Sequence, residues 1–99
     1  MSAREMKRKA RAFVLLSVAL GKEEEVLEKL LKIGEVKEVH IITGEKDLIV
    51  VLETERELVV PSSKKITDLI SRRIASINGV QDTETIIPTH SKTKWPEQN

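Results

Sequence analysis

The fold is decided by the stretch from Val36 to Leu52, which is V-K-E-V-H-I-I-T-G-E-K-D-L-I-V-V-L. Two runs rich in Val and Ile flank a short polar segment, Thr43–Asp47, which contains Gly44. Branched side chains suit the pleated, half-buried surface of a sheet, and a short linker with glycine is typical of a hairpin turn. The stretch therefore predicts a β-hairpin, and the hydroxyl, glycine and carboxylates of its turn are suited to holding a small ligand.

Strands and helices are predicted on both sides of this hairpin. A first strand is expected at Arg11–Ala19, and a last strand at Val80–Ile87. The first helix spans residues 22–33, where three glutamates in the first turn complement the helix dipole. Its apolar stripe is Val26, Leu27, Leu30, Leu31 and Ile33. Gly34 is expected to cap this helix in the left-handed conformation.

A second helix is predicted after a polar link at Thr54–Glu57 and an apolar run at Leu58–Val60. Pro61 followed by Ser62 and Ser63 is a signal for the start of a helix. The helix is expected to end at Asn78–Gly79. Its apolar face is Ile66, Leu69, Ile70, Ile74 and Ile77, and its opposite face carries Lys64, Lys65, Arg72 and Arg73.

An internal repeat joins these elements into one fold. The passage I-G-E-V-K-E-V-H-I-I-T from Ile33 resembles I-N-G-V-Q-D-T-E-T-I-I from Ile77. Two successive β-α-β units predict the ferredoxin-like βαββαβ plait of the α+β class, also found in dimeric α+β barrels. This is a four-stranded antiparallel sheet with two helices on one face and the first and third strands in the centre.

The two central strands are predicted to be apolar on both sides, whereas the edge strands are mixed. Helices cover only one face, so the other face would expose an apolar patch that monomers rarely tolerate. A second copy, packed sheet against sheet, is the simplest cover. The sequence therefore predicts a homodimer.

Composition excludes several classes of protein. The chain has 99 residues, enough for one small domain, and only 2% of them are aromatic, so the core must be aliphatic. With no Cys, the chain has neither disulfides nor thiolate metal sites. No apolar run approaches the roughly 20 residues of a membrane span. A cytoplasmic protein without membrane contact is the default expectation.

The net charge of +1 conceals an asymmetry between the N-terminus and the rest of the chain. Residues 1–11 carry an excess of positive charge from Arg4, Lys7, Arg8, Lys9 and Arg11, opposed by Glu5. Two interpretations stay open, a solvated basic arm at residues 1–10 and an arm that contacts nucleic-acid phosphates.

No catalytic set is present in the sequence. The only histidines are His40, in the middle of a predicted edge strand, and His90, in the polar tail at residues 89–99. Ser62 and Ser63 fit helix caps better than nucleophiles, because no base lies near them in the sequence. We predict a binding protein without a metal or cofactor, and not an enzyme.

Residues 11–88 resemble the ligand-binding domain of the Lrp/AsnC transcription regulators, the RAM domain. The resemblance rests on G-K-E-E-E-V, L-L-K-I-G-E-V-K-E-V, T-G-E-K-D-L-I-V and I-N-G-V-Q-D-T-E-T-I-I. Its most specific part is the hairpin, where the family pattern T-G-x-[YF]-D-[LYF] is matched at Thr43, Gly44 and Asp47. Lys46 stands where the family has an aromatic residue.

The resemblance implies a module that binds an amino-acid effector and controls transcription of amino-acid metabolism genes. The implied ligand-binding residues are Thr43, Gly44, Glu45 and Asp47. Backbone groups around Gly44 would meet a carboxylate, Asp47 would meet an ammonium or brace the turn, and Thr43 would donate its hydroxyl. Residues near Thr89 and His90 of a neighbouring subunit would complete the pocket.

The resemblance also implies homodimers, larger rings and association with full-length relatives. The short segment before the domain is too small for a helix-turn-helix, so we expect a stand-alone RAM domain without direct sequence-specific DNA binding. Two other functions stay open, a small dimeric α+β-barrel enzyme and a purely structural oligomerisation module.

Overall fold

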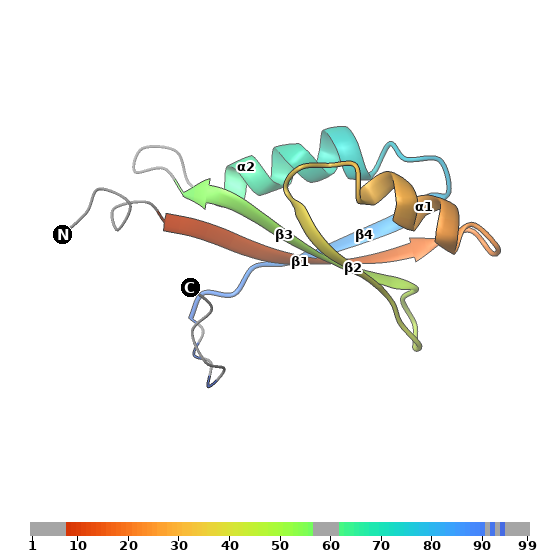
Figure 1. Cartoon of the computed structure of the whole chain (residues 1–99), viewed down its shortest axis with the longest axis horizontal. Coiled ribbons are helices and arrows are strands. Elements are labelled where there is room, and N and C mark those ends of the chain that lie inside the picture. Colours follow the sequence, from red (N-terminus) through yellow and green to blue (C-terminus); the bar gives the residue numbers. More distant parts are fainter. Residues whose placement is uncertain (1–7, 57–61, 91, 93, 95–99) are drawn as a thin grey trace.

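Four antiparallel strands form one sheet in the order β2-β3-β1-β4, and both helices cover the same face (Figure 1). The computed structural model describes residues 8–56, 62–90, 92 and 94. The elements in chain order are β1 (Arg8–Val18), α1 (Glu23–Leu30), β2 (Val36–Ile41), β3 (Leu48–Arg56), α2 (Ser62–Leu69), the π-helical turn η2 (Ile70–Ile74) and β4 (Val80–Ile86). The predicted ferredoxin-like α+β fold is confirmed, with β1 and β3 in the centre.

The core lies between the sheet and the helices. Alternate residues of the central strands face the helices, because successive side chains of a strand point to opposite faces. Those of the helix-side row are almost fully buried: Ala12, Val14, Leu16 and Val18 of β1, and Leu48, Val50 and Leu52 of β3. They pack with Val26 and Leu30 of α1 and with Ile66, Ile70 and Ile74 of the second helix. The core is aliphatic, as the composition predicted.

The central strands are longer than the sequence predicted. β1 begins at Arg8 instead of Arg11, so its first residues come from the segment interpreted as a basic arm. β3 continues to Arg56, so the predicted polar link at Thr54–Glu57 is wrong for residues 54–56. The antiparallel pairing of β1 with β3 runs through both extensions, and next to them Arg11 lies opposite Glu53 with their charged groups 3.9 Å apart. Opposite charges in direct cross-strand pairs stabilise a sheet even where its residues are polar.

The helix ends also differ from the prediction. α1 ends at Leu30, and the next residue, Leu31, is right-handed and half exposed instead of contributing to the buried stripe. The predicted left-handed cap at Gly34 is wrong, since the glycines with positive φ are Gly21, Gly44 and Gly79. Short-range bonds tighten the end of α1 instead, with the N–H of Ile33 donating to the carbonyl of Leu30 at 3.0 Å.

The second helix starts at Ser62 as predicted, but its last turn is wider than an α-helical turn. The N–H of Ala75 donates to the carbonyl of Ile70 at 2.9 Å, five residues back along the chain, as in a π-helix. The wide turn keeps both Ile70 and Ile74 buried. Helical periodicity in the sequence contains no signal for such a turn.

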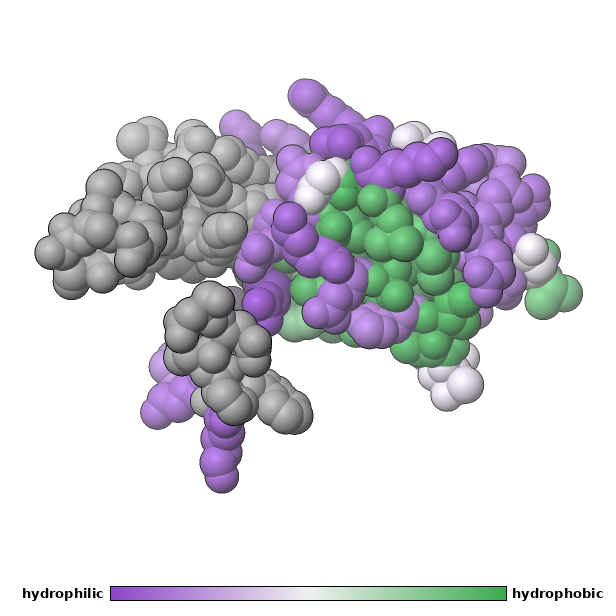
Figure 2. All heavy atoms as spheres, viewed as in Figure 1, coloured by the Kyte–Doolittle hydropathy of each residue, from purple (hydrophilic) through white to green (hydrophobic). Residues whose placement is uncertain are grey.

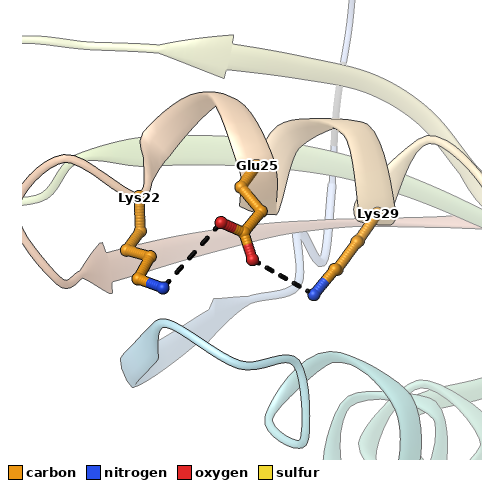
Figure 3. A network of polar contacts seen from close by, with 3 residues as sticks. All are labelled: Lys22, Glu25 and Lys29. Carbon is orange, nitrogen blue, oxygen red and sulfur yellow. Dashed lines mark hydrogen bonds and ion pairs between the residues drawn. The ribbon is translucent and has the colours of Figure 1, made fainter.

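The exposed surface of α1 is held by local ion pairs (Figure 3). The carboxylate of Glu25 lies 3.8 Å from the ammonium of Lys22 and 3.3 Å from that of Lys29. Pairs at these helical spacings contribute roughly 0.2–0.5 kcal/mol each. Glu25 therefore stabilises the helix, in agreement with the interpretation of the acidic turn from the sequence.

Gly79 and Gly34 occupy similar places in the internal repeat, yet their surroundings predict opposite responses to substitution. Gly79 has φ +107°, and a Cβ there would lie 3.0 Å from Cγ2 of Val26 and 3.2 Å from Cβ of Lys22. Gly79→Ala should therefore lower the free energy of unfolding by about 1–3 kcal/mol. Gly34→Ala, where a Cβ meets nothing within 4 Å, is the control and should change it by less than about 0.5 kcal/mol. Equal urea midpoints for the two variants would contradict this account.

Candidate functional site

The hairpin turn between β2 and β3 lies at the end of the sheet where β1 also ends. The N–H of Ile42 donates to the carbonyl of Asp47 at 2.9 Å and closes the turn. Gly44 has φ +122°, a conformation that favours glycine, and open space lies where its Cβ would be. Thr43, Gly44 and Glu45 are exposed. A ligand therefore has free access to the backbone and hydroxyl groups of this turn.

Asp47 is the residue that fixes the turn in place. Its Oδ2 accepts a hydrogen bond of 2.8 Å from the backbone N–H of Val18. Its own N–H donates to the carbonyl of Leu16 at 2.8 Å. The pairing of β1 with β4 shifts register between Ser17 and Val18, and the carboxylate satisfies an N–H at this irregular point. Of the two roles that the resemblance implied for Asp47, the structure provides the brace.

Lys46 extends the same anchoring to the far edge of the sheet. Its ammonium lies 3.2 Å from Oδ2 of Asp82, which belongs to β4. The register places Asp82 opposite Ser17, on the sheet face that carries no helix. The turn is thus tied to both β1 and β4. Sequence reasoning missed the contacts of Lys46 and Asp47, because each joins residues that only the sheet order brings together.

The other candidate polar residues do not join the turn within one chain. His40 lies on the edge strand β2, with its Nε2 2.9 Å from Oε1 of Glu38. Thr89 and His90 follow β4, whose last residue, Ile86, pairs with Phe13, far along β1 from the turn. Among residues 8–56, 62–90, 92 and 94, no group of three His, Asp or Glu side chains is placed to hold a metal ion.

Residues 11–94 match the family model described as the Lrp/AsnC ligand binding domain. The chain belongs to the Lrp/AsnC family. The match includes every strand and helix except the first residues of β1. It agrees with the resemblance seen in the hairpin and in the repeated β-α-β units.

Relatives of this Lrp/AsnC chain are transcription regulators and solved domains of the same shape. The HTH-type transcriptional regulator FL11 of Pyrococcus furiosus is 36% identical over 76 residues, which are 77% of this chain and 46% of the relative. The crystal structure of FFRP-DM1 is 42% identical, with a TM-score of 0.69, over 80% of this chain and 97% of that one. The transcriptional regulator NMB0573 from Neisseria meningitidis, solved as a complex with L-Met, shares the fold with a TM-score of 0.69 at 20% identity, over 97% of this chain and 62% of that one.

The chain spans about half the length of the curated relatives it matches. The names of the family and of these relatives indicate transcription regulators and not enzymes. In the part of the chain that the structure describes, neither helix has the length and apolar character needed to cross a bilayer.

The brace formed by Asp47 predicts a measurable loss of stability when the acceptor is removed. Asp47→Ala leaves the N–H of Val18 without its partner and should lower the free energy of unfolding by about 1–3 kcal/mol. Asp47→Asn keeps a carbonyl acceptor and should cost less, about 1 kcal/mol. Denaturant titration gives both values, with Glu45→Ala as an exposed control expected within about 0.5 kcal/mol. An Asp47→Ala variant as stable as the control would disprove the brace.

Proposed function

We propose that this Lrp/AsnC domain binds a small effector of the amino-acid class at the hairpin turn and acts as an oligomerisation module in transcription regulation. The observation that carries the proposal is a turn that is open to solvent at Gly44 yet held rigidly by Asp47. A rigid turn of this kind favours binding, because it loses little conformational freedom when the ligand binds. The L-Met complex of NMB0573 supports an amino acid as the class of ligand.

The chemistry of the turn suits the two ends of an amino acid. Backbone N–H groups beside an exposed glycine can approach a carboxylate closely, since no side chain blocks them. The hydroxyl of Thr43 adds a donor, and the carboxylate of Glu45 is available to an ammonium. Asp47 serves this site as a positioning residue, because its Oδ2 already accepts from Val18.

The sheet face without helices supports a dimer. Its central row is apolar and consists of Phe13, Leu15, Ile49, Val51 and Ile86, placed on one face by the strand registers. Ile86 remains 46% exposed in the isolated chain. Polar residues border the row, with Glu38 and His40 on β2 and Asp82 and Glu84 on β4. An apolar centre with a polar rim is the usual anatomy of a protein interface.

A second apolar surface lies near the turn and suits assembly beyond a dimer. Figure 2 shows apolar atoms exposed where β2 and the hairpin lie, bordered by hydrophilic residues. Ile41 of β2 is 47% exposed and directly precedes the turn. Assembly over this surface would bring residues of a neighbouring subunit, such as Thr89 and His90, to the turn. Full-length relatives that share the interface would then join mixed assemblies.

A catalytic role finds no support in the interior. Every buried residue in the described part of the chain is apolar. Among the described residues, none of those buried between sheet and helices is an acid, a base or a nucleophile. A purely structural oligomerisation module remains the second candidate, because the apolar face by itself accounts for a dimer.

Thermal denaturation in the presence of each of the twenty amino acids tests the binding proposal. A ligand at 100 times its dissociation constant should stabilise the domain by about 2.7 kcal/mol and raise the midpoint by several degrees. Thr43→Val should weaken the effect, while Thr67→Val, at another exposed threonine, on α2, should retain it. If no amino acid raises the midpoint, the structural module becomes the better account.

The dimer is tested by placing a charge in the apolar row. Leu15→Lys puts an ammonium on the open face and should raise the dimer dissociation constant at least tenfold. Leu20→Lys, at a position 97% exposed in the loop after β1, is the control and should leave the constant unchanged. Sedimentation equilibrium gives the masses, and circular dichroism checks that both variants fold. A wild-type protein that stays monomeric at micromolar concentration would contradict the dimer.

A further inference from the structure

We infer that the free edge of β2 pairs with β2 of a second copy of this chain, so that two sheets continue as one. The strand order places β2 at one edge of the sheet, with β3 on one side only. We call the contact between the two β2 strands the edge interface. It rests on the assembly beyond a dimer in the proposed function, and it uses the edge of the sheet, whereas the proposed dimer uses the open face.

Alternate residues of β2 direct their backbone groups to the free edge. The N–H of Ile42 donates to the carbonyl of Asp47, next to β3, so the backbone groups of Ile42 point toward β3. This direction alternates from residue to residue along a strand, and Val39 and Ile41 therefore point their N–H and C=O groups outward. Among the described strands, only β3 pairs with β2. The edge thus offers backbone donors and acceptors to an added strand.

The charges of β2 favour a second copy of the same strand as the partner. Glu38 and His40 both lie on the open side of the strand, opposite residues of β3 that belong to the apolar row, and both are exposed. An antiparallel pair of β2 strands centred on Val39 places Glu38 of each copy opposite His40 of the other. Opposed groups of this kind stabilise a strand pair. Registers centred on Glu38 or His40 would instead oppose identical groups.

The helix side of β2 carries exposed apolar side chains that fit the same arrangement. Leu31, directly after α1, is 50% exposed, and Ile41, the last residue of β2, is 47% exposed. Figure 2 shows hydrophobic atoms at the surface where β2 lies. Leu31 lies near the start of β2, because only a short link separates them, and Ile41 lies at its end. A two-fold axis at Val39 therefore brings Leu31 of each copy toward Ile41 of the other.

The opposite edge of the sheet does not suit the same contact. The charged residues of β4 are Asp82 and Glu84, which are both acidic and exposed. A second β4 beside the first would add carboxylates to carboxylates, and charges of one sign keep edge strands apart. Of the two edges, β2 is the one that combines opposite charges with exposed apolar side chains.

The edge interface also brings the second copy close to the candidate turn. The register centred on Val39 places Lys37 of the second copy opposite Ile41, which leads through Ile42 into the turn at Thr43. Lys37 is exposed. Its ammonium then approaches the turn where the carboxylate of the effector is proposed to bind. An effector that contacts both the turn and this ammonium binds the joined form more tightly and therefore favours it.

Sedimentation equilibrium of variants in the Leu15→Lys background tests the edge interface apart from the sheet-to-sheet dimer. Leu15→Lys alone should still associate as a dimer, because its β2 edge is intact, whereas wild type should form larger assemblies. Adding Glu38→Lys places an ammonium opposite the imidazole twice and should raise the dissociation constant of that dimer about tenfold. Adding His40→Glu as well restores opposite charges and should return the constant to within about threefold of the Leu15→Lys value.

Amide hydrogen exchange gives a second measurement of the same contact. The N–H groups of Val39 and Ile41 point to the free edge, so they should exchange more slowly in the Leu15→Lys dimer than after Glu38→Lys is added. Asp68→Lys, the same change of charge at an exposed position of α2, is the control and should alter neither the masses nor the exchange. Circular dichroism checks that every variant folds.

Three results would overturn the inference. One is a Leu15→Lys protein that is monomeric at micromolar concentration, which would leave the edge to a strand of another protein. Another is equal weakening by Glu38→Lys and Asp68→Lys, or failure of His40→Glu to restore the dimer. The third is fast exchange at Val39 and Ile41 in every assembly. If the masses and the exchange are as expected but no amino acid stabilises the domain, the proposed effector fails and the edge interface stands.

Discussion

The structure depends on one constraint, the pairing of two strands that are apolar on both faces with helices that cover only one. β1 and β3 pair without interruption from Arg8 opposite Arg56 to Leu16 opposite Leu48. The helix-side residues Ala12, Val14, Leu16 and Val18 of β1 and Leu48, Val50 and Leu52 of β3 are almost fully buried against α1 and the second helix. Their other row leaves the second face of the sheet apolar, and an apolar sheet face is normally covered by a second layer of structure. The fold, the proposed dimer and the position of the hairpin all follow from this pair of strands.

Asp47 links this constraint to the candidate site. Through its carboxylate and its N–H it contacts Val18 and Leu16, at the end of the central strand β1. Lys46 adds a contact to Asp82 on the opposite edge strand. The turn is therefore part of the sheet and not an independent loop. A ligand that orders or displaces the turn would act directly on the end of the face where the partner is proposed to lie.

Local patterns in the sequence predicted most of the fold, and contacts between distant segments decided the rest. The alternation in Val36–Leu52 and the repeated β-α-β units identified the strand order, because the periodicities of strands and helices differ. Gly34 and Gly79 both lie between a helix and the strand that follows it, yet only Gly79 of the two has positive φ. Residues 54–56 are polar, and they form a strand because β1 supplies a backbone partner along their whole length. The residues of the candidate turn were evident from the sequence. The contacts made by Lys46 and Asp47 could be identified only once the strand order of the sheet was known.

The central place of β1 has a consequence for the order in which the domain can form during synthesis. β1 precedes the other elements of this domain in the chain, and during synthesis it gains its two neighbours at very different times. β3 follows at Leu48–Arg56, but β4 comes only at Val80–Ile86. Until then one edge of β1 has no hydrogen-bonding partner, and unpaired edges invite pairing with other chains. The nascent domain is therefore most vulnerable to aggregation just before its final strand emerges, and pairing of β4 with β1 completes both the sheet and the bulge beside Asp47.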